Sequence, residues 1–254
     1  MMLLAAFVMG AVVGSFLNVC IARLPIGESI VFPPSHCPGC GTRIRVRDNI
    51  PLLSYALLRG RCRDCGQGIT LRYPLVEALT GLLFALLLYR FGWTPTVVVP
   101  AAFVAALVVV SFIDLDHQII PDVVSLPGIG TGLLLALAGY GPPILDSILG
   151  VLLGGGLLWA VAAGYEWIKG QEGMGGGDIK LLAMIGAFLG WRAVLLTLIL
   201  GSLSGAVVGG SLILLRGADS RAPIPFGPFL AVGALVALFF GEQLIGWYFN
   251  LVLL

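Results

Sequence analysis

The sequence predicts an all-α polytopic membrane protein with about eight transmembrane helices and one small polar insertion. Of its 254 residues, 59% are hydrophobic and only 11% are charged. A soluble protein of this length needs more polar surface to cover its core, so we expect the lipid bilayer to be its main surroundings. The formal net charge of +1 gives no basic field for a nucleic acid, and we expect no nucleic-acid partner.

Apolar segments recur along the chain, and most approach the roughly 20 residues that a helix needs to cross the hydrocarbon core. The segment that ends at residue 190 is the shortest of them. We expect it to begin earlier, in the preceding glycine run, or to cross a locally thinned bilayer. The predicted segments are residues 1–22, 75–91, 96–113, 123–140, 144–167, 178–190, 193–215 and 227–253.

Glycines inside these segments recur at a spacing of four residues, which is about one helical turn. Each set therefore lies on one face of its helix and lets a neighbouring helix approach closely. We expect these faces to be tight helix–helix contacts. The sets are Gly10 and Gly14, Gly150 and Gly154, and Gly201, Gly205 and Gly209.

The basic residues predict how the chain is oriented in the membrane. The first segment has no basic residue before Arg23, so we expect a retained helix and not a cleaved signal. If the amino terminus is outside and the chain crosses eight times, every Lys and Arg except Arg90 and Arg192 lies on one side. Basic loops stay in the cytoplasm, so this side of an inner (plasma) membrane is the cytoplasmic one. The loops expected there are residues 24–74, 114–122, 168–178 and 216–226.

The polar insertion gives the chain three predicted parts: a first transmembrane helix at 1–22, a cytoplasmic domain at 23–74 and a membrane domain at 75–254. Four of the five cysteines lie in the insertion, in two C-x-x-C-G turns. Two such turns form a closed set of four thiolates, which suits a structural zinc ion. Disulfides or two separate redox pairs are the alternative, and a reducing cytoplasm argues against disulfides. The predicted zinc ligands are Cys37, Cys40, Cys62 and Cys65.

Two aspartates stand apart from the other acidic residues. Asp122 and Asp146 precede apolar runs, where helix capping explains them. Asp114, in contrast, continues an apolar run, and Asp178 follows Gly175-Gly176-Gly177 and opens the next run. We expect both carboxylates at the cytoplasmic membrane edge, with the glycines allowing close backbone approach and a left-handed or strained turn. Ionisable residues at such depth are costly and indicate function.

Two carboxylates that share a dry site hold one proton between them. One member then activates a water molecule while the other protonates the carbonyl oxygen or the leaving amine. The alternative from the pattern alone is two unrelated charges at the membrane surface, paired with Lys180 or Arg216. The pattern also does not distinguish Asp114 from Asp116.

An ordered series of motifs resembles one known family, the type IV prepilin leader peptidases, which are bacterial members of the G-x-G-D membrane aspartyl proteases. The series covers nearly the full chain and includes the two C-x-x-C turns. The other motifs are Gly14-Ser15-Phe16-Leu17-Asn18-Val19, Arg23-Leu24-Pro25, Asn49-Ile50-Pro51 with Ser54-Tyr55, Arg72-Tyr73-Pro74-Leu75-Val76-Glu77, Ile113-Asp114-Leu115-Asp116-His117, Ile120-Pro121-Asp122, Gly173-Met174-Gly175-Gly176-Gly177-Asp178-Ile179-Lys180-Leu181 and Ile224-Pro225-Phe226-Gly227-Pro228.

The resemblance implies that Asp114, the first aspartate of the D-x-D-H motif, and Asp178, the aspartate of the G-x-G-D motif, are the catalytic pair. It implies that the four cysteines bind zinc, and that the substrates are prepilins or pseudopilins, cut at a glycine between a basic leader and an apolar helix. It also implies N-methylation of the new amino terminus with S-adenosylmethionine. No glycine-rich nucleotide motif follows a strand in this sequence, so the residues that bind this cofactor stay unassigned.

Two other functions are weighed against this one. The first is a membrane transporter or channel with a zinc-bound cytoplasmic domain, in which the aspartates relay protons. Such proteins are typically built from inverted repeats with broken helices, and the sequence contains no convincing repeat. The second is a protein in which methyl transfer is the surviving activity and cleavage is lost.

Overall fold

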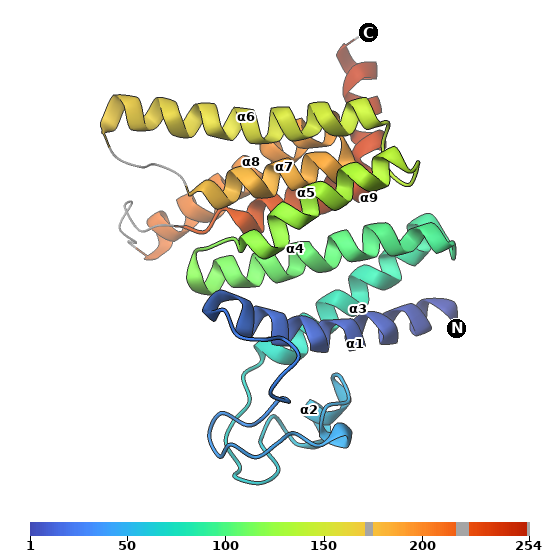
Figure 1. Ribbon diagram of the computed structural model, residues 1–254, viewed down its shortest axis with the longest axis vertical. Coiled ribbons are helices and arrows are strands. Elements are labelled where there is room, and N and C mark those ends of the chain that lie inside the picture. The colour runs from blue at the N-terminus through green and yellow to red at the C-terminus, as the bar shows by residue number, and fades with distance from the viewer. Residues whose placement is uncertain (171–174, 217–223, 253–254) are drawn as a thin grey trace. The chain divides into compact units, whose positions relative to one another are not determined.

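Helices form at all eight apolar segments, as the sequence predicts (Figure 1). A chain in lipid must satisfy its backbone hydrogen bonds internally, and helices achieve this within one segment. The computed structural model describes residues 1–170, 175–216 and 224–252, and within these ranges the chain forms no β-strand. The eight helices are α1 (Met2–Arg23), α3 (Arg72–Phe91), α4 (Val98–His117), α5 (Asp122–Leu137), α6 (Ile144–Lys169), α7 (Gly176–Leu189), α8 (Trp191–Arg216) and α9 (Gly227–Val252).

Six of these helices are long and apolar enough to cross a membrane, by length and composition. The other two, α5 and α7, are shorter, with 16 and 14 residues. Helix α7 begins at Gly176, so this segment does start in the glycine run before residue 178. The fold class is thus confirmed, with six long helices and two short ones in place of eight full-length spans.

The chain divides into two compact units, Met1–Val109 and Val110–Leu254, and each is described by itself. In the first unit, α1 lies along α3 (Figure 1). A Cβ atom at Gly10 would lie 2.7 Å from Cβ of Phe84, and one at Gly14 would lie 2.8 Å from Cα of Glu77. The predicted close approach at this glycine pair is therefore confirmed.

The polar insertion between α1 and α3 carries little regular structure. It contains the 3-10 turns η1 (Leu24–Ile26) and η2 (Val46–Asp48) and the short helix α2 (Leu53–Leu57). Two isolated antiparallel bridges, His36 with Arg43 and Arg61 with Gly68, close the chain around the two C-x-x-C turns. A third 3-10 turn, η3 (Pro95–Val97), leads into α4.

Helix α7 is the centre of the second unit and packs against α5, α6, α8 and α9. Its residues 181–187 are all buried. The backbones of α6 and α7 touch at Gly150 and Gly186, where neither residue has room for a Cβ atom. A Cβ atom at Gly201 would lie 3.2 Å from the carbonyl oxygen of Phe229, so α8 and α9 also meet at a glycine. The glycine sets of α6 and α8 thus pack as predicted.

Candidate functional site

Asp114 lies in the last turn of α4, and its side chain is only 5% exposed. The backbone N–H of Gly227, the first residue of α9, donates a buried hydrogen bond of 2.9 Å to Oδ2 of Asp114. Asp116, two residues further along α4, is exposed. The structure therefore separates two aspartates that the sequence pattern left equivalent.

The close contact between residue 227 and Asp114 leaves no room for a side chain at position 227 unless a neighbouring group moves. A Cβ atom there would lie 2.8 Å from Oδ2 of Asp114 and 3.3 Å from Cδ1 of Ile120. A Cβ contact under 3.0 Å forces one of the partners to move. The motif around Gly227 was visible in the sequence, but nothing in a linear pattern indicated that its amide binds an aspartate more than a hundred residues away.

Asp178 lies in the first turn of α7 and is partly exposed. A Cβ atom at Gly177 would lie 2.8 Å from Cβ of Ile120, so this glycine lets the start of α7 approach the segment that follows α4. The predicted left-handed turn is not found in the described part of the glycine run. Gly175 is extended, with φ −68° and ψ 139°, and Gly176 already belongs to the helix. Gly173 and Met174 of the same motif lie outside the described residues.

The two aspartates come to the same end of the second unit, because Gly177, beside Asp178, and Gly227, which binds Asp114, both pack against Ile120. The alternative pairing of these carboxylates with Lys180 is not found. Lys180 Nζ binds Asp122 instead, at 2.6 Å from Oδ1 and 2.9 Å from Oδ2. Asp122 was expected to cap its helix, but Pro121 is the N-cap of α5 and Asp122 lies in the first turn. Its carboxylate is thus occupied by the lysine.

Four cysteine sulfurs form a cluster in the insertion, all within 4.8 Å of one another. They are Sγ of Cys37, Cys40, Cys62 and Cys65. The sulfurs of Cys37 and Cys65 are 3.8 Å apart, and a tetrahedron with metal–sulfur bonds of about 2.3 Å has edges of about 3.8 Å. None of the five cysteines forms a disulfide. The cluster is therefore in position to bind a metal ion.

The two C-x-x-C turns have the same backbone geometry. The Cys37 N–H donates to the Thr42 carbonyl at 2.9 Å, and the Cys62 N–H donates to the Gln67 carbonyl at 2.8 Å. The glycines that follow, Gly41 and Gly66, have φ of +70° and +72°, which is the left-handed region that glycine adopts without strain. The glycine in each motif is thus required by the turn itself.

Local hydrogen bonds favour the thiolate form that a metal requires at two of the four cysteines, whereas partial desolvation and the neighbouring cysteine side chains raise the pKa of the Cys65 thiol to about 12. The side chain and backbone of Thr42 lower the pKa of the Cys40 thiol to about 6. The backbone N–H groups of Cys65 and Asp64 lower the pKa of the Cys62 thiol. The donor set and its surroundings therefore fit a divalent ion of the zinc type.

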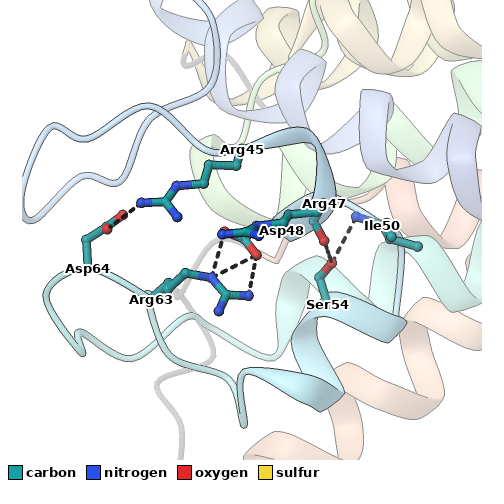
Figure 2. A network of polar contacts seen from close by, with 7 residues as sticks. All are labelled: Arg45, Arg47, Asp48, Ile50, Ser54, Arg63 and Asp64. Atoms are coloured by element: carbon teal, nitrogen blue, oxygen red, sulfur yellow. Dashed lines mark hydrogen bonds and ion pairs between the residues drawn. The ribbon is translucent and has the colours of Figure 1, made fainter.

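Arginine–aspartate ion pairs connect the loops around this cluster (Figure 2). Arg63 donates to both carboxylate oxygens of Asp48, with a shortest distance of 2.6 Å, and the Asp48 side chain is 9% exposed. The guanidinium of Arg63 holds the pKa of Asp48 below its usual range. Arg45 and Asp64 form a longer and more exposed pair at 3.3 Å. These contacts tie the second C-x-x-C turn, at Arg63 and Asp64, to the segment at 45–48.

Buried polar groups anchor the insertion to the helices beneath it. The Glu77 carboxylate of α3 accepts the Leu52 N–H at 2.8 Å, and Leu52 is held at φ +63°. The Asn18 amide of α1 donates to the Tyr73 carbonyl at 3.1 Å. Arg23, at the end of α1, donates to the carbonyls of Ser29 and Pro33. The sequence contained these residues in motifs but gave no sign of what their side chains bind.

Comparison with known proteins adds two family matches and a set of relatives. Residues 8–91 match the bacterial peptidase A24 N-terminal domain, and residues 101–210 match the type IV leader peptidase family. Proteins named prepilin leader peptidase/N-methyltransferase are similar over nearly the whole chain. Those of Aeromonas salmonicida (strain A449) and Pseudomonas aeruginosa are each 40% identical, over 97% and 96% of this chain and 94% and 92% of their own lengths.

A protein of the same name from Myxococcus xanthus is 48% identical over 83% of this chain and 63% of its own length. No solved structure gives a significant match.

Proposed function

The chain belongs to the type IV leader peptidase family, and on this basis we propose that it is a membrane aspartyl endopeptidase that uses Asp114 and Asp178. Its substrates are type IV prepilins or pseudopilins, from which it removes the basic leader. It then N-methylates the new amino terminus with S-adenosylmethionine. The observation that supports the catalytic assignment is that two residues 64 positions apart in the chain lie on either side of Ile120. Gly177, next to Asp178, packs against Ile120, and so does Gly227, whose N–H binds Asp114.

The geometry supports a division of labour between the two carboxylates. The Gly227 N–H occupies Oδ2 of Asp114, which orients this carboxylate and leaves Oδ1 to accept a proton from water. The proton that the pair shares passes to the scissile carbonyl as the water oxygen attacks the carbon. When the C–N bond breaks, a proton moves to the leaving nitrogen. The products are a free leader carboxylate and a new amino terminus.

We propose that the site lies where a prepilin presents its scissile bond. A prepilin keeps its apolar helix in the bilayer and its charged leader in the cytoplasm, so the bond to be cut lies at the membrane edge. Asp114 and Asp178 lie in the last turn of α4 and the first turn of α7, both apolar helices, which supports a location at that edge. We propose that this edge is the cytoplasmic one, because the basic loops of the chain are expected there.

The tetracysteine domain, residues 23–74, is proposed to bind one structural zinc ion through Cys37, Cys40, Cys62 and Cys65. Four sulfurs within 4.8 Å of one another close a tetrahedral site and leave no position for a substrate. The domain follows the first transmembrane helix, 1–22, and precedes the membrane peptidase domain, 75–254. With so little regular structure, the insertion depends on the metal for much of its folding free energy.

Conservative substitution of either aspartate tests the catalytic assignment. We expect Asp114→Asn and Asp178→Asn each to lower the rate of prepilin cleavage by at least about 100-fold, because an amide has the shape of a carboxylate but exchanges no proton. Purified enzyme is incubated with a prepilin from the same genome, and mass spectrometry of the product measures cleavage and methylation separately. Asp116→Asn is the control and retains cleavage.

Full cleavage by the Asp114→Asn or Asp178→Asn variant would remove that residue from the catalytic pair. Methylation without any cleavage in the wild-type protein, on a substrate supplied without its leader, would support the reading in which only methyl transfer survives.

A further inference from the structure

A cavity of about 520 Å³ lies within the first unit, between the tetracysteine domain and the ends of α1 and α3. Pockets that bind small organic ligands have volumes of about 300–1,000 Å³. The residues that line this cavity include aspartates, glutamates, arginines and two tyrosines, Tyr55 and Tyr73. Its size and its mixture of charged and aromatic groups are typical of a site for a polar ligand with a flat ring.

Two of the four acidic residues that line the cavity have a cation as partner. Asp48 is paired with Arg63, and Asp64 is paired with Arg45 (Figure 2). These pairs fix the shape of the loops and leave little net charge for a ligand.

Glu77 is the buried one of these four residues, whereas Glu28 and Asp64 are exposed and Asp48 is partly exposed. Glu77 is only 8% exposed. Its carboxylate accepts hydrogen bonds from the Leu52 N–H and the Ser15 side chain, and both donors are neutral. Within residues 1–170, 175–216 and 224–252, no cation pairs with it. A buried carboxylate without a cation is costly, so the cavity favours a ligand that brings a positive charge to Glu77.

We propose that this cavity binds the methyl donor, S-adenosylmethionine, with its sulfonium facing Glu77; this assignment rests on the methyltransferase part of the proposed function. The donor carries a sulfonium, an amino acid carboxylate and an adenine ring. Arg43, which lines the cavity and forms no ion pair in the described chain, suits the carboxylate, and a tyrosine ring suits the adenine.

The charge at sulfur is also what the reaction consumes. The lone pair of the new terminal amine forms the N–C bond, the S–C bonding pair returns to sulfur, and the amine loses a proton to water. The product thioether is neutral, so a carboxylate beside the sulfur holds the donor more strongly than the product.

Ligands that differ in charge at this one position test the assignment to Glu77. Binding is measured by calorimetry on the full-length, zinc-loaded protein in detergent, with S-adenosylhomocysteine, which is neutral at sulfur, and sinefungin, which has an amino group in its place. We expect the Glu77→Gln substitution to weaken the binding of sinefungin by about 10- to 100-fold, which is the effect of losing one charged contact. S-adenosylhomocysteine should bind within a few-fold of wild type, because glutamine still accepts the Leu52 N–H.

A second pair of variants tests the cavity without relying on Glu77. Val19 of α1 lines the cavity, whereas Val12, on the same helix, is 55% exposed and does not. We expect Val19→Trp to weaken the binding of both ligands and Val12→Trp to leave the binding of both unchanged. Zinc content and hydrogen exchange of residues 24–74 establish that each variant is folded.

The outcomes separate this proposal from the function on which it rests. Equal loss of both ligands in Glu77→Gln would overturn the role of its charge, and unchanged binding in Val19→Trp would overturn the location. If the wild-type protein cleaves a prepilin but binds neither ligand, then the methyltransferase function fails together with the cavity. If the wild-type protein binds the ligands and neither Glu77→Gln nor Val19→Trp changes that binding, the methyltransferase function stands and only this cavity is rejected as the binding site.

Discussion

The contact between Gly227 and Asp114 shows how one backbone amide can set the position of the carboxylate that we propose to be catalytic. The N–H of Gly227 lies 2.9 Å from Oδ2, in a place where a Cβ atom would collide with the same oxygen. The residue therefore acts through its lack of a side chain as much as through its hydrogen bond. It is a positioning residue, because it touches Asp114 and not the substrate.

We expect Gly227→Ala to lower the efficiency of prepilin cleavage by about 10- to 100-fold, since displacing a catalytic group by about 1 Å costs up to that much. Gly246→Ala is the matched control, because a Cβ atom at Gly246 of the same helix meets nothing within 4 Å. Cleavage rates and the protein's thermal unfolding are compared for the two variants. If both retain the wild-type rate, the contact does not position Asp114 for catalysis.

At the scale of elements, the tetracysteine domain is held together from two sides. The cysteine turns provide a closed set of ligands, and Glu77, Asn18 and Arg23 tie neighbouring segments of the chain to one another. The first contribution depends on a metal and the second does not. Removing the metal therefore affects the loops around the cysteines more than the helices that flank them.

Chelation of zinc, or Cys62→Ser, is expected to unfold much of residues 24–74 while α1 and α3 stay helical. Structural zinc in small domains contributes about 10–16 kcal/mol of apparent binding free energy, which this insertion has no large core to replace. Hydrogen exchange measured peptide by peptide locates the change, and elemental analysis measures the metal. Cys20→Ala, at a buried cysteine outside the cluster, is the control. A well-folded insertion without any bound zinc would contradict this prediction.

For the whole molecule, contacts between helix ends that are far apart in the sequence constrain how often the chain crosses the membrane. Gly177 at the start of α7 touches Ile120, which lies between α4 and α5, and Gly227 at the start of α9 touches Asp114. The chain must therefore return to the same side after α5 and α6, and again after α7 and α8. Because α6 and α8 are long enough to cross, we infer that α5 and α7 cross as well.

The short lengths of α5 and α7 make this inference testable. At about 1.5 Å per residue they span about 24 and 21 Å, less than a hydrocarbon core of about 30 Å, so the bilayer beside them must thin. We expect alkaline phosphatase to be active when fused after Thr94 or Tyr140, and β-galactosidase to be active after Lys169. If β-galactosidase is active after Tyr140 and alkaline phosphatase is active after Lys169, while the Thr94 fusion behaves as expected, then α5 does not cross the membrane.

The sequence by itself determined the features that depend on neighbouring residues. Hydropathy and length predicted every long helix, because a bilayer selects apolar segments one at a time. The C-x-x-C-G spacing predicted that the four cysteine sulfurs gather in position to bind a metal, because each turn is closed within a few residues of chain. The ordered motifs predicted the family through their resemblance, and the comparisons confirm that membership.

Only the tertiary structure decided what depends on packing between distant segments. It distinguished buried Asp114 from exposed Asp116, found the Gly227 amide beside Asp114, and brought Asp178 to the same end of the unit through the contact of Gly177 with Ile120. It also placed Glu77 at the wall of a cavity, where no cation from the described part of the chain pairs with it. These relations arise where helices cross, and the order of residues along one helix does not contain the rotation or the depth at which another helix meets it.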